Sequence, residues 1–322
     1  MRLWKKFSRA LLAADRHPAP PPPPTENFPL LEVRRLRLRR DNRSGRGTSP
    51  GLSFAVRTGE VLIVLGDNGS GKSLLLNFLA GVFLPPDPDA AVTVGGHDLR
   101  ERAARRWARE RVGVVFQQPA LVHALTVFEN VALPLRQSQA ARWSEEEIRA
   151  QVGRLLGLVG VGGFDDDYPR ELSEGLQGCV ALARALAGGR RLLLCDEPTA
   201  GLSPDKAYQI DELLAWLMRS GALDAAVIFT QNLESALRVG TRFLLLGSGT
   251  RFGEGKFYSH AEALRSCAEF QRFLQHPDDA PFFPSASSTS AVAARFRSPL
   301  SHPDHASDST ASALPVSLQN CL

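Results

Sequence analysis

Short apolar runs alternate with longer amphipathic segments through the middle of the chain. Two runs, Val61–Leu65 and Leu192–Cys195, are apolar along their whole length, which is typical of strands buried on both faces of a parallel sheet. The alternation predicts one α/β domain with a mainly parallel sheet. The other expected strands are Leu31–Leu36, Val112–Phe116, Ala226–Thr230 and Phe243–Leu246. The expected helices are Ser73–Ala80, Glu145–Val159, Gly175–Ala187, Ala207–Met218 and Leu233–Val239.

Both ends of the chain differ in composition from this middle part. Residues 1–14 mix Trp, Phe and Leu with Lys and Arg, and the proline run Pro18–Pro24 that follows is typical of a stiff, extended spacer. The first 14 residues fit either a short amphipathic helix on an anionic membrane surface or a disordered leader, and they lack the features of a secretory signal. Residues 285–322 contain ten serines and are expected to be disordered.

Composition and charge narrow the class of protein. Hydrophobic residues make up 43% and charged residues 22% of the 322 residues, close to the globular average, which excludes a wholly disordered or coiled-coil chain. The excess of basic residues lies in residues 1–50, with 12 Lys and Arg against 4 Asp and Glu, so we expect no nucleic-acid partner. The four cysteines form no CxxC pair, and no apolar run approaches the ~20 residues of a membrane span. These features predict a cytoplasmic protein.

A glycine-rich loop follows the strand Val61–Leu65 and runs into a leucine-rich helix. Its G-x-x-x-x-G-K-S pattern is that of a phosphate-binding loop in the required strand–loop–helix setting, which argues against an ordinary turn. Consecutive backbone N–H groups can point at phosphate oxygens, Lys72 can bridge the β- and γ-phosphates, and Ser73 can ligate Mg²⁺. The expected nucleotide-binding residues of this loop are Gly66, Asp67, Asn68, Gly69, Ser70, Gly71, Lys72 and Ser73.

Two adjacent acids, Asp196 and Glu197, end the buried strand that begins at Leu192. Beside a phosphate loop, Asp196 can hold Mg²⁺ through water, and Glu197 can orient and deprotonate the attacking water. Taken alone, such a pair is often only a helix cap at the end of a strand.

Two further segments narrow the kind of phosphate-loop protein. Gln117 lies in an FQQP segment after an expected strand, and the segment Leu172–Leu176 (LSEGL) opens the helix before the Asp196 strand. The order of phosphate loop, glutamine loop, LSEGL segment and carboxylate strand resembles the nucleotide-binding domain of ABC transporters over about residues 30–275. The LSEGL segment is similar to the ABC signature, and Asp196–Gly201 (DEPTAG) is similar to the second Walker motif with the loop after it.

The resemblance implies a P-loop NTPase fold of the ABC type, with a mainly parallel sheet core, an antiparallel β subdomain and an inserted helical subdomain. It places a basic, Pro-rich arm at residues 1–29, the ABC nucleotide-binding domain at residues 30–275 and a disordered tail at residues 276–322. The helical subdomain is expected at about residues 118–188.

The resemblance also implies an ATPase with Mg²⁺ that works as a homodimer or a heterodimer. Ser173 and Gly175 of one domain would face the phosphates bound by the other, and Gln117 would sense the γ-phosphate and the metal. Ser73, Gln117 and Asp196 are thus the implied metal ligands. A membrane permease would dock near residues 118–140, placing the chain on the cytoplasmic face of the inner membrane.

Within ABC ATPases, the chain most resembles the Mla-type subunit that energises phospholipid transport in Gram-negative bacteria. The supporting segments are Thr126–Arg136 (TVFENVALPLR), Tyr168–Leu172 (YPREL) and Asn232–Ala236 (NLESA). Related lipoprotein and amino-acid exporters carry similar stretches.

Positions around the expected reaction centre depart from the family pattern. Gln231, named here with Glu197 as catalytic, stands where the family has a switch histidine, and an amide cannot carry a proton or a positive charge. Ser203 replaces an aspartate, and Glu174 replaces a glycine of the signature. Leu38 or Arg40 stands where an aromatic residue usually stacks on adenine.

These departures leave three functions open. The first is an ATP-hydrolysing motor of a lipid transporter. The second is a degenerate, poorly hydrolysing regulatory subunit of a heterodimeric transporter. The third is a soluble ABC protein of DNA repair or translation, which usually has a long coiled-coil insertion or two tandem domains.

Overall fold

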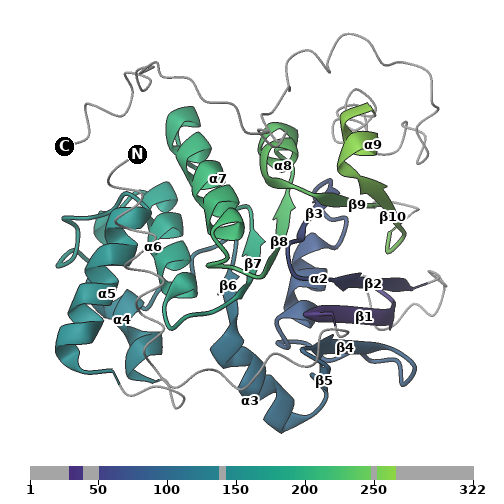
Figure 1. The fold of residues 1–322 in the computed structure, drawn as a ribbon, viewed down its shortest axis with the longest axis horizontal. Coiled ribbons are helices and arrows are strands. Elements are labelled where there is room, and N and C mark those ends of the chain that lie inside the picture. Colours follow the sequence, from purple (N-terminus) through teal and green to yellow (C-terminus); the bar gives the residue numbers. More distant parts are fainter. Residues whose placement is uncertain (1–28, 39–50, 138–142, 248–251, 266–322) are drawn as a thin grey trace, which may run out of the picture.

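A computed structural model describes residues 29–38, 51–137, 143–247 and 252–265 (Figure 1). The arm at 1–29, apart from its last residue, the tail at 276–322 and Arg40 lie outside the described residues. Within the described part, no helix is both long enough and apolar enough to span a membrane.

Six strands form the central sheet, in the order β10-β9-β3-β8-β7-β6. β10 pairs antiparallel with β9, and the other neighbours are parallel. β3, β7 and β8 are buried at every position, which matches the apolar runs in the sequence. The strands are β3 (Val61–Gly66), β6 (Val112–Val115), β7 (Leu192–Asp196), β8 (Ala225–Thr230), β9 (Arg242–Leu246) and β10 (Gly255–Ser259).

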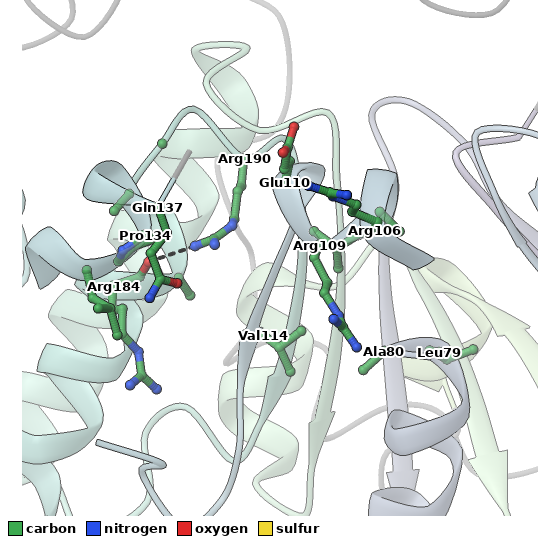
Figure 2. Close-up of a pocket in the computed structure, with 16 residues that line it drawn as sticks. Leu79, Ala80, Arg106, Arg109, Glu110, Val114, Pro134, Gln137, Arg184 and Arg190 are labelled. Carbon is green, nitrogen blue, oxygen red and sulfur yellow. Dashed lines mark hydrogen bonds between the residues drawn. The ribbon is translucent and has the colours of Figure 1, made fainter. Parts of the chain in front are cut away.

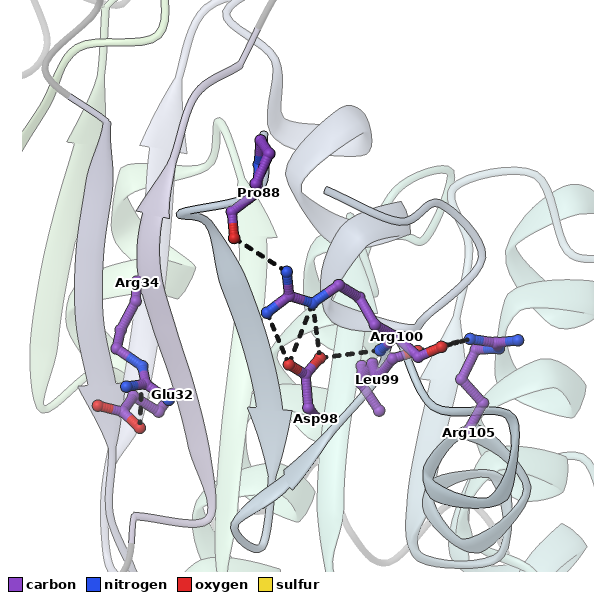
Figure 3. Close-up of polar contacts among 7 residues, drawn as sticks. All are labelled: Glu32, Arg34, Pro88, Asp98, Leu99, Arg100 and Arg105. Atoms are coloured by element: carbon purple, nitrogen blue, oxygen red, sulfur yellow. Dashed lines mark hydrogen bonds and ion pairs between the residues drawn. The ribbon is translucent and has the colours of Figure 1, made fainter. Parts of the chain in front are cut away.

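A second sheet is antiparallel and has the order β2-β1-β4-β5. Its strands are β1 (Leu31–Leu36), β2 (Leu52–Val56), β4 (Ala91–Val94) and β5 (His97–Asp98). Its apolar side chains share one core with the helix α2 (Lys72–Leu79) and one face of the central sheet. At its edge, Arg100 pairs with Asp98 at 2.9 Å and donates a hydrogen bond to the carbonyl oxygen of Pro88 at 3.1 Å (Figure 3). This contact ties β5 to the loop before β4.

Helices cover the opposite face of the central sheet and extend beyond β6 (Figure 1). Three of them, α4 (Val127–Arg136), α5 (Glu145–Leu158) and α6 (Glu174–Leu186), follow one another between β6 and β7. A short 3-10 helix at Pro169–Glu171 precedes α6. The remaining helices are α3 (Arg102–Arg111), α7 (Pro204–Arg219), α8 (Leu233–Val239) and α9 (His260–Arg265).

The expected fold class is confirmed: a mainly parallel core carries a separate antiparallel sheet and a helical insertion. Because β3, β7 and β8 are adjacent and parallel, their carboxyl ends meet at one edge of the sheet. Ligands of open α/β sheets bind at this edge. The phosphate loop, Asp196 and Thr230 are therefore brought together by strand order alone.

Candidate nucleotide-binding site

The phosphate loop connects β3 to α2. Gly69 and Gly71 have φ angles of 79° and 99°, in the left-handed region that glycine adopts without steric cost. The ammonium group of Lys72 donates hydrogen bonds to the carbonyl oxygens of Gly66 at 2.7 Å and Asp67 at 3.0 Å. The lysine side chain thus lies against the loop, where phosphate oxygens can replace these carbonyls.

Lys72 is only 7% exposed. Burial lowers the pKa of its ammonium group, and the nearby carboxylates of Glu197 and Asp196 act in the opposite direction. A polyphosphate would bring negative charge to this desolvated cation, which makes charge-assisted hydrogen bonds favourable here.

Ser73 and Asp196 form the candidate metal site. The hydroxyl of Ser73 donates a 2.8 Å hydrogen bond to Oδ2 of Asp196, which joins the first turn of α2 to the end of β7. Burial raises the pKa of the Asp196 carboxyl, although Ser73 and Lys72 oppose the rise. No three His, Cys, Asp or Glu side chains of the described residues form a metal site by themselves. One hydroxyl and one carboxylate are hard oxygen donors, and they fit a Mg²⁺ ion that takes its other ligands from phosphate and water.

Glu197 occupies a strained position at the same edge. Its φ angle is 49°, which is uncommon for a residue with a side chain. Its carboxylate accepts hydrogen bonds from the Thr230 hydroxyl and from the backbone N–H of Gln231, both at 2.9 Å. Burial raises the pKa of this carboxyl, despite those hydrogen bonds and Lys72. A carboxylate held in this way, next to a phosphate loop, is suited to accept a proton from water.

Most of the expected site residues line one cavity of about 440 Å³. Gln231 lies within it because its amide donates a 2.6 Å hydrogen bond to Oδ1 of Asn68 in the phosphate loop. Gln117 reaches the cavity from the segment after β6. The lining residues are Asp67, Asn68, Gly69, Gly71, Lys72, Ser73, Leu74, Gln117, Asp196, Glu197, Gln231 and Phe252.

Ser173 and Gly175 are not brought to this cavity. Ser173 caps α6, and its hydroxyl accepts a hydrogen bond from the backbone N–H of Leu176 at 3.4 Å. A Cβ atom on Gly175 would lie 2.7 Å from the carbonyl oxygen of Gly201, so a side chain does not fit there. Both residues have structural roles within this chain, and their expected contact with phosphate requires a second domain.

Three residues of the site were missed in the sequence, and one of them is Leu74, which lines the cavity from the first turn of α2. Thr230 donates a hydrogen bond to Glu197 and so orients it. Thr230 is the last residue of an expected strand, and this position could have indicated a site residue. Phe252 lines the cavity from the segment between β9 and β10, where neither strand spacing nor a motif indicated a site residue.

Comparison with known proteins agrees with the nucleotide-binding geometry of this cavity. Residues 50–200 match the family model described as ABC transporter. The chain is also similar in structure to the ATP-binding cassette MJ0796, solved as a dimer in a post-hydrolysis state with ADP and Pi. The TM-score is 0.64 and the identity 26%, and the match covers 71% of this chain and 98% of that one. Residues 50–200 thus correspond to an ABC transporter domain, and the described part of the chain has the fold of an ABC-type ATPase. The resemblance of the chain to ABC transporter subunits is thereby confirmed.

The curated relatives of this ABC domain are named for import. The chain is 42% identical to the sulfate/thiosulfate import ATP-binding protein CysA of Rhodopseudomonas palustris over 201 residues, which is 62% of this chain and 56% of that protein. It is 37% identical to the methionine import ATP-binding protein MetN of Caulobacter vibrioides over 207 residues, 64% of this chain and 60% of that protein. The chain thus spans less than two thirds of the length of these relatives.

Proposed function

We propose that the chain is the ATP-hydrolysing subunit of an ABC transporter, acting as a dimer with a membrane permease. One observation carries the proposal: Lys72, Ser73, Asp196 and Glu197 converge on a single cavity in a domain that matches the ABC transporter family. The solved cassette with a similar fold is described as a dimer bound to ADP and Pi, which supports nucleotide turnover by such a domain.

In this proposal, each residue of the site has a distinct task. The backbone N–H groups of the phosphate loop and the ammonium of Lys72 bind the β- and γ-phosphates. Ser73, Asp196 and Gln117 would hold Mg²⁺, and the ion when bound would supply positive charge against the phosphate oxygens. Glu197 orients the attacking water and accepts its proton. The amide of Gln231 can donate one hydrogen bond to the γ-phosphate, but it cannot supply a positive charge there.

The partner domain completes the site. Ser173 and Gly175 lie away from the cavity of their own chain, so we propose that they contact the nucleotide of a second copy or of a related subunit. The exposed carboxylate of Glu174 would then approach that nucleotide from the first turn of α6. If it lay ~4 Å from a phosphate oxygen, the repulsion would reach roughly 4 kcal/mol at an effective dielectric of ~20.

For the transported solute, the relatives favour import of a small polar compound over phospholipid. They are named for sulfate/thiosulfate and methionine import, so phospholipid transport receives no support from them. The three segments that resemble the Mla-type subunit all contain helix-start contacts: Thr126 and Glu129 form a capping box, Glu171 bonds the backbone N–H of Tyr168, and Asn232 caps α8. Helix caps of this kind occur in many unrelated proteins, so these contacts carry little information about the solute.

We propose that the permease binds at a cleft of about 590 Å³ between α3 and the helices α4 and α6 (Figure 2). Its apolar lining includes Val114 and Leu133, and the α4 wall belongs to the segment where the family resemblance places the permease. The cationic lining residues are Arg106, Arg109, Arg184 and Arg190, against one acid, Glu110. This combination favours an amphipathic partner segment that carries carboxylates.

An ATPase assay of the purified chain tests the proposed activity. Hydrolysis of Mg-ATP by the wild type that is lost in Glu197→Gln would support it. The degenerate-subunit alternative expects little wild-type hydrolysis and at least a ~10-fold gain in the Gln231→His, Glu174→Gly double variant, since relief of about 1.4 kcal/mol gives that factor. Absence of hydrolysis in every variant would contradict both.

A further inference from the structure

The nucleotide cavity has a polar side and an apolar side. Phosphate-loop residues and the two acids form the polar side, while Leu74 and Phe252 supply apolar surface. Phe252 is the one aromatic residue among the described residues that line this cavity. A nucleotide has the same division, because charged phosphates are joined to a flat aromatic base.

Phe252 lies directly against the phosphate loop. A Cβ atom built on Gly71 would lie 3.3 Å from ring atoms Cε2 and Cζ of Phe252, and 3.2 Å from Cδ1 of Leu38. The ring also packs against the core below the antiparallel sheet and is only partly buried. One part of the ring therefore packs against the core, and another part lines the cavity.

The sheet order explains how a residue so late in the chain reaches this point. β9 pairs in parallel with β3, and Leu246 at its end is in register with Gly66 at the start of the phosphate loop. Phe252 comes shortly after β9, before the antiparallel strand β10. The end of β9 and Phe252 thus both lie beside the phosphate loop.

We propose that Phe252 is the side chain on which the nucleobase stacks, an inference that rests on the proposed binding of nucleotide. The sequence indicated Leu38 or Arg40 for this contact, by resemblance to the family. Leu38 is 3% exposed and contributes almost no surface to a ligand. Phe252 supplies the flat apolar surface from a different part of the chain.

Stacking on a phenyl ring depends weakly on which base is present, since every base has a π-face. Loss of the ring should therefore lower the affinity for ATP and the affinity for GTP by a similar factor. For stacking of ordinary strength this factor is about 5- to 150-fold. Tripolyphosphate carries the phosphate chain without a base, so loss of the ring should leave the affinity for tripolyphosphate unchanged. The ratio of nucleotide affinity to tripolyphosphate affinity isolates the contribution of the base.

The test measures binding of ATP, GTP and tripolyphosphate, each with Mg²⁺, to the full chain and three variants by calorimetry. Phe252→Ala should lose at least ~5-fold in affinity for ATP and GTP and keep its affinity for tripolyphosphate, and Phe252→Trp should retain nucleotide binding. Phe257→Ala is the matched control, because Phe257 packs against Phe54 at a centroid distance of 5.7 Å and does not line the nucleotide cavity.

Equal losses for all three ligands in Phe252→Ala would show that the ring only supports the phosphate loop, and would overturn the inference. Unchanged affinity for all three would overturn it as well. If the wild type bound tripolyphosphate but Phe252→Trp lost ATP as fully as Phe252→Ala, stacking would also be excluded. Failure of the wild type to bind any of the three would instead remove the proposed function on which the inference rests.

Discussion

Glu197 is held in an energetically costly state. A non-glycine residue in the left-handed region costs on the order of 1–3 kcal/mol, and the φ angle of Glu197 is 49°. Burial also raises the pKa of its carboxyl, so ionisation at neutral pH is disfavoured in the folded chain relative to the unfolded chain. Such a cost is expected where a group serves chemistry rather than stability.

We expect Glu197→Gln to raise the melting temperature of the nucleotide-free chain, because it removes a buried charge and keeps the side-chain shape. A raised pKa in the folded state means that the wild type loses stability as the pH rises through that pKa. The difference between variant and wild type should therefore be large at pH 7 and shrink below about pH 4.3, the ordinary pKa of glutamate. Thermal denaturation across this pH range measures it, and a lower melting temperature for Glu197→Gln at pH 7 would contradict this account.

Among the elements, α4 shows why a helix can be missed in a sequence. Pro134 lies inside this helix, and an internal proline usually indicates that a helix ends. The segment Thr126–Arg136 was used only as evidence for a subfamily, and no helix with these bounds was predicted. The fully buried Asn130 fixes the loop before it: its Nδ2 group donates to the carbonyl oxygens of Val122, Leu125 and Thr126, and its Oδ1 accepts from the N–H of Val122.

We expect Asn130→Ala to lower the free energy of unfolding by about 2–3 kcal/mol, since it leaves buried backbone groups without partners. Chemical denaturation measures the change. Gln137→Ala, at the exposed end of the same helix, is the control and should change stability by less than about 0.5 kcal/mol. A loss for Asn130→Ala no larger than that of the control would show that the loop is not anchored there.

Other elements were predictable to different degrees. The strands β3, β7 and β8 were found to within one residue at each end, because strands buried on both faces leave continuous apolar runs. β10 was missed, since only Tyr258 among its five residues is buried. α3 was missed because five of its ten residues are arginine and its buried residues are only Ala104 and Ala108. An element without an apolar stripe leaves no periodic signal.

The arginines of α3 belong to the cleft proposed as the permease site, and Arg109 tests it. Arg109 is exposed and lines the cleft, whereas Arg102 on the same helix is exposed and does not. We expect Arg109→Glu to reduce co-purification of the chain with its membrane partner by at least ~10-fold, because a carboxylate would then face carboxylates. Arg102→Glu is the matched control, and equal retention by both variants would exclude the cleft. ATP binding should be unchanged in both.

On the scale of the whole molecule, the sheet order brings distant segments to one cavity. The phosphate loop and the acids could be assigned from the sequence because the G-x-x-x-x-G-K-S pattern and the two acids that end a buried strand are local signals. Phe252 could not, since it depends on β9 pairing with β3 instead of with its sequence neighbour β8. Ser173 and Gly175 could be named only by resemblance, because their expected ligand belongs to another domain.

The central claim is that this cavity binds Mg-ATP through Lys72, and a thermal shift assay tests it most directly. A ligand that binds only the folded state stabilises it by about 2.7 kcal/mol at 100 times its dissociation constant. We expect saturating Mg-ATP to raise the melting temperature of the wild type by several degrees and to leave that of Lys72→Ala unchanged. An equal shift in the wild type and in Lys72→Ala, or no shift in the wild type, would contradict the assignment of the site.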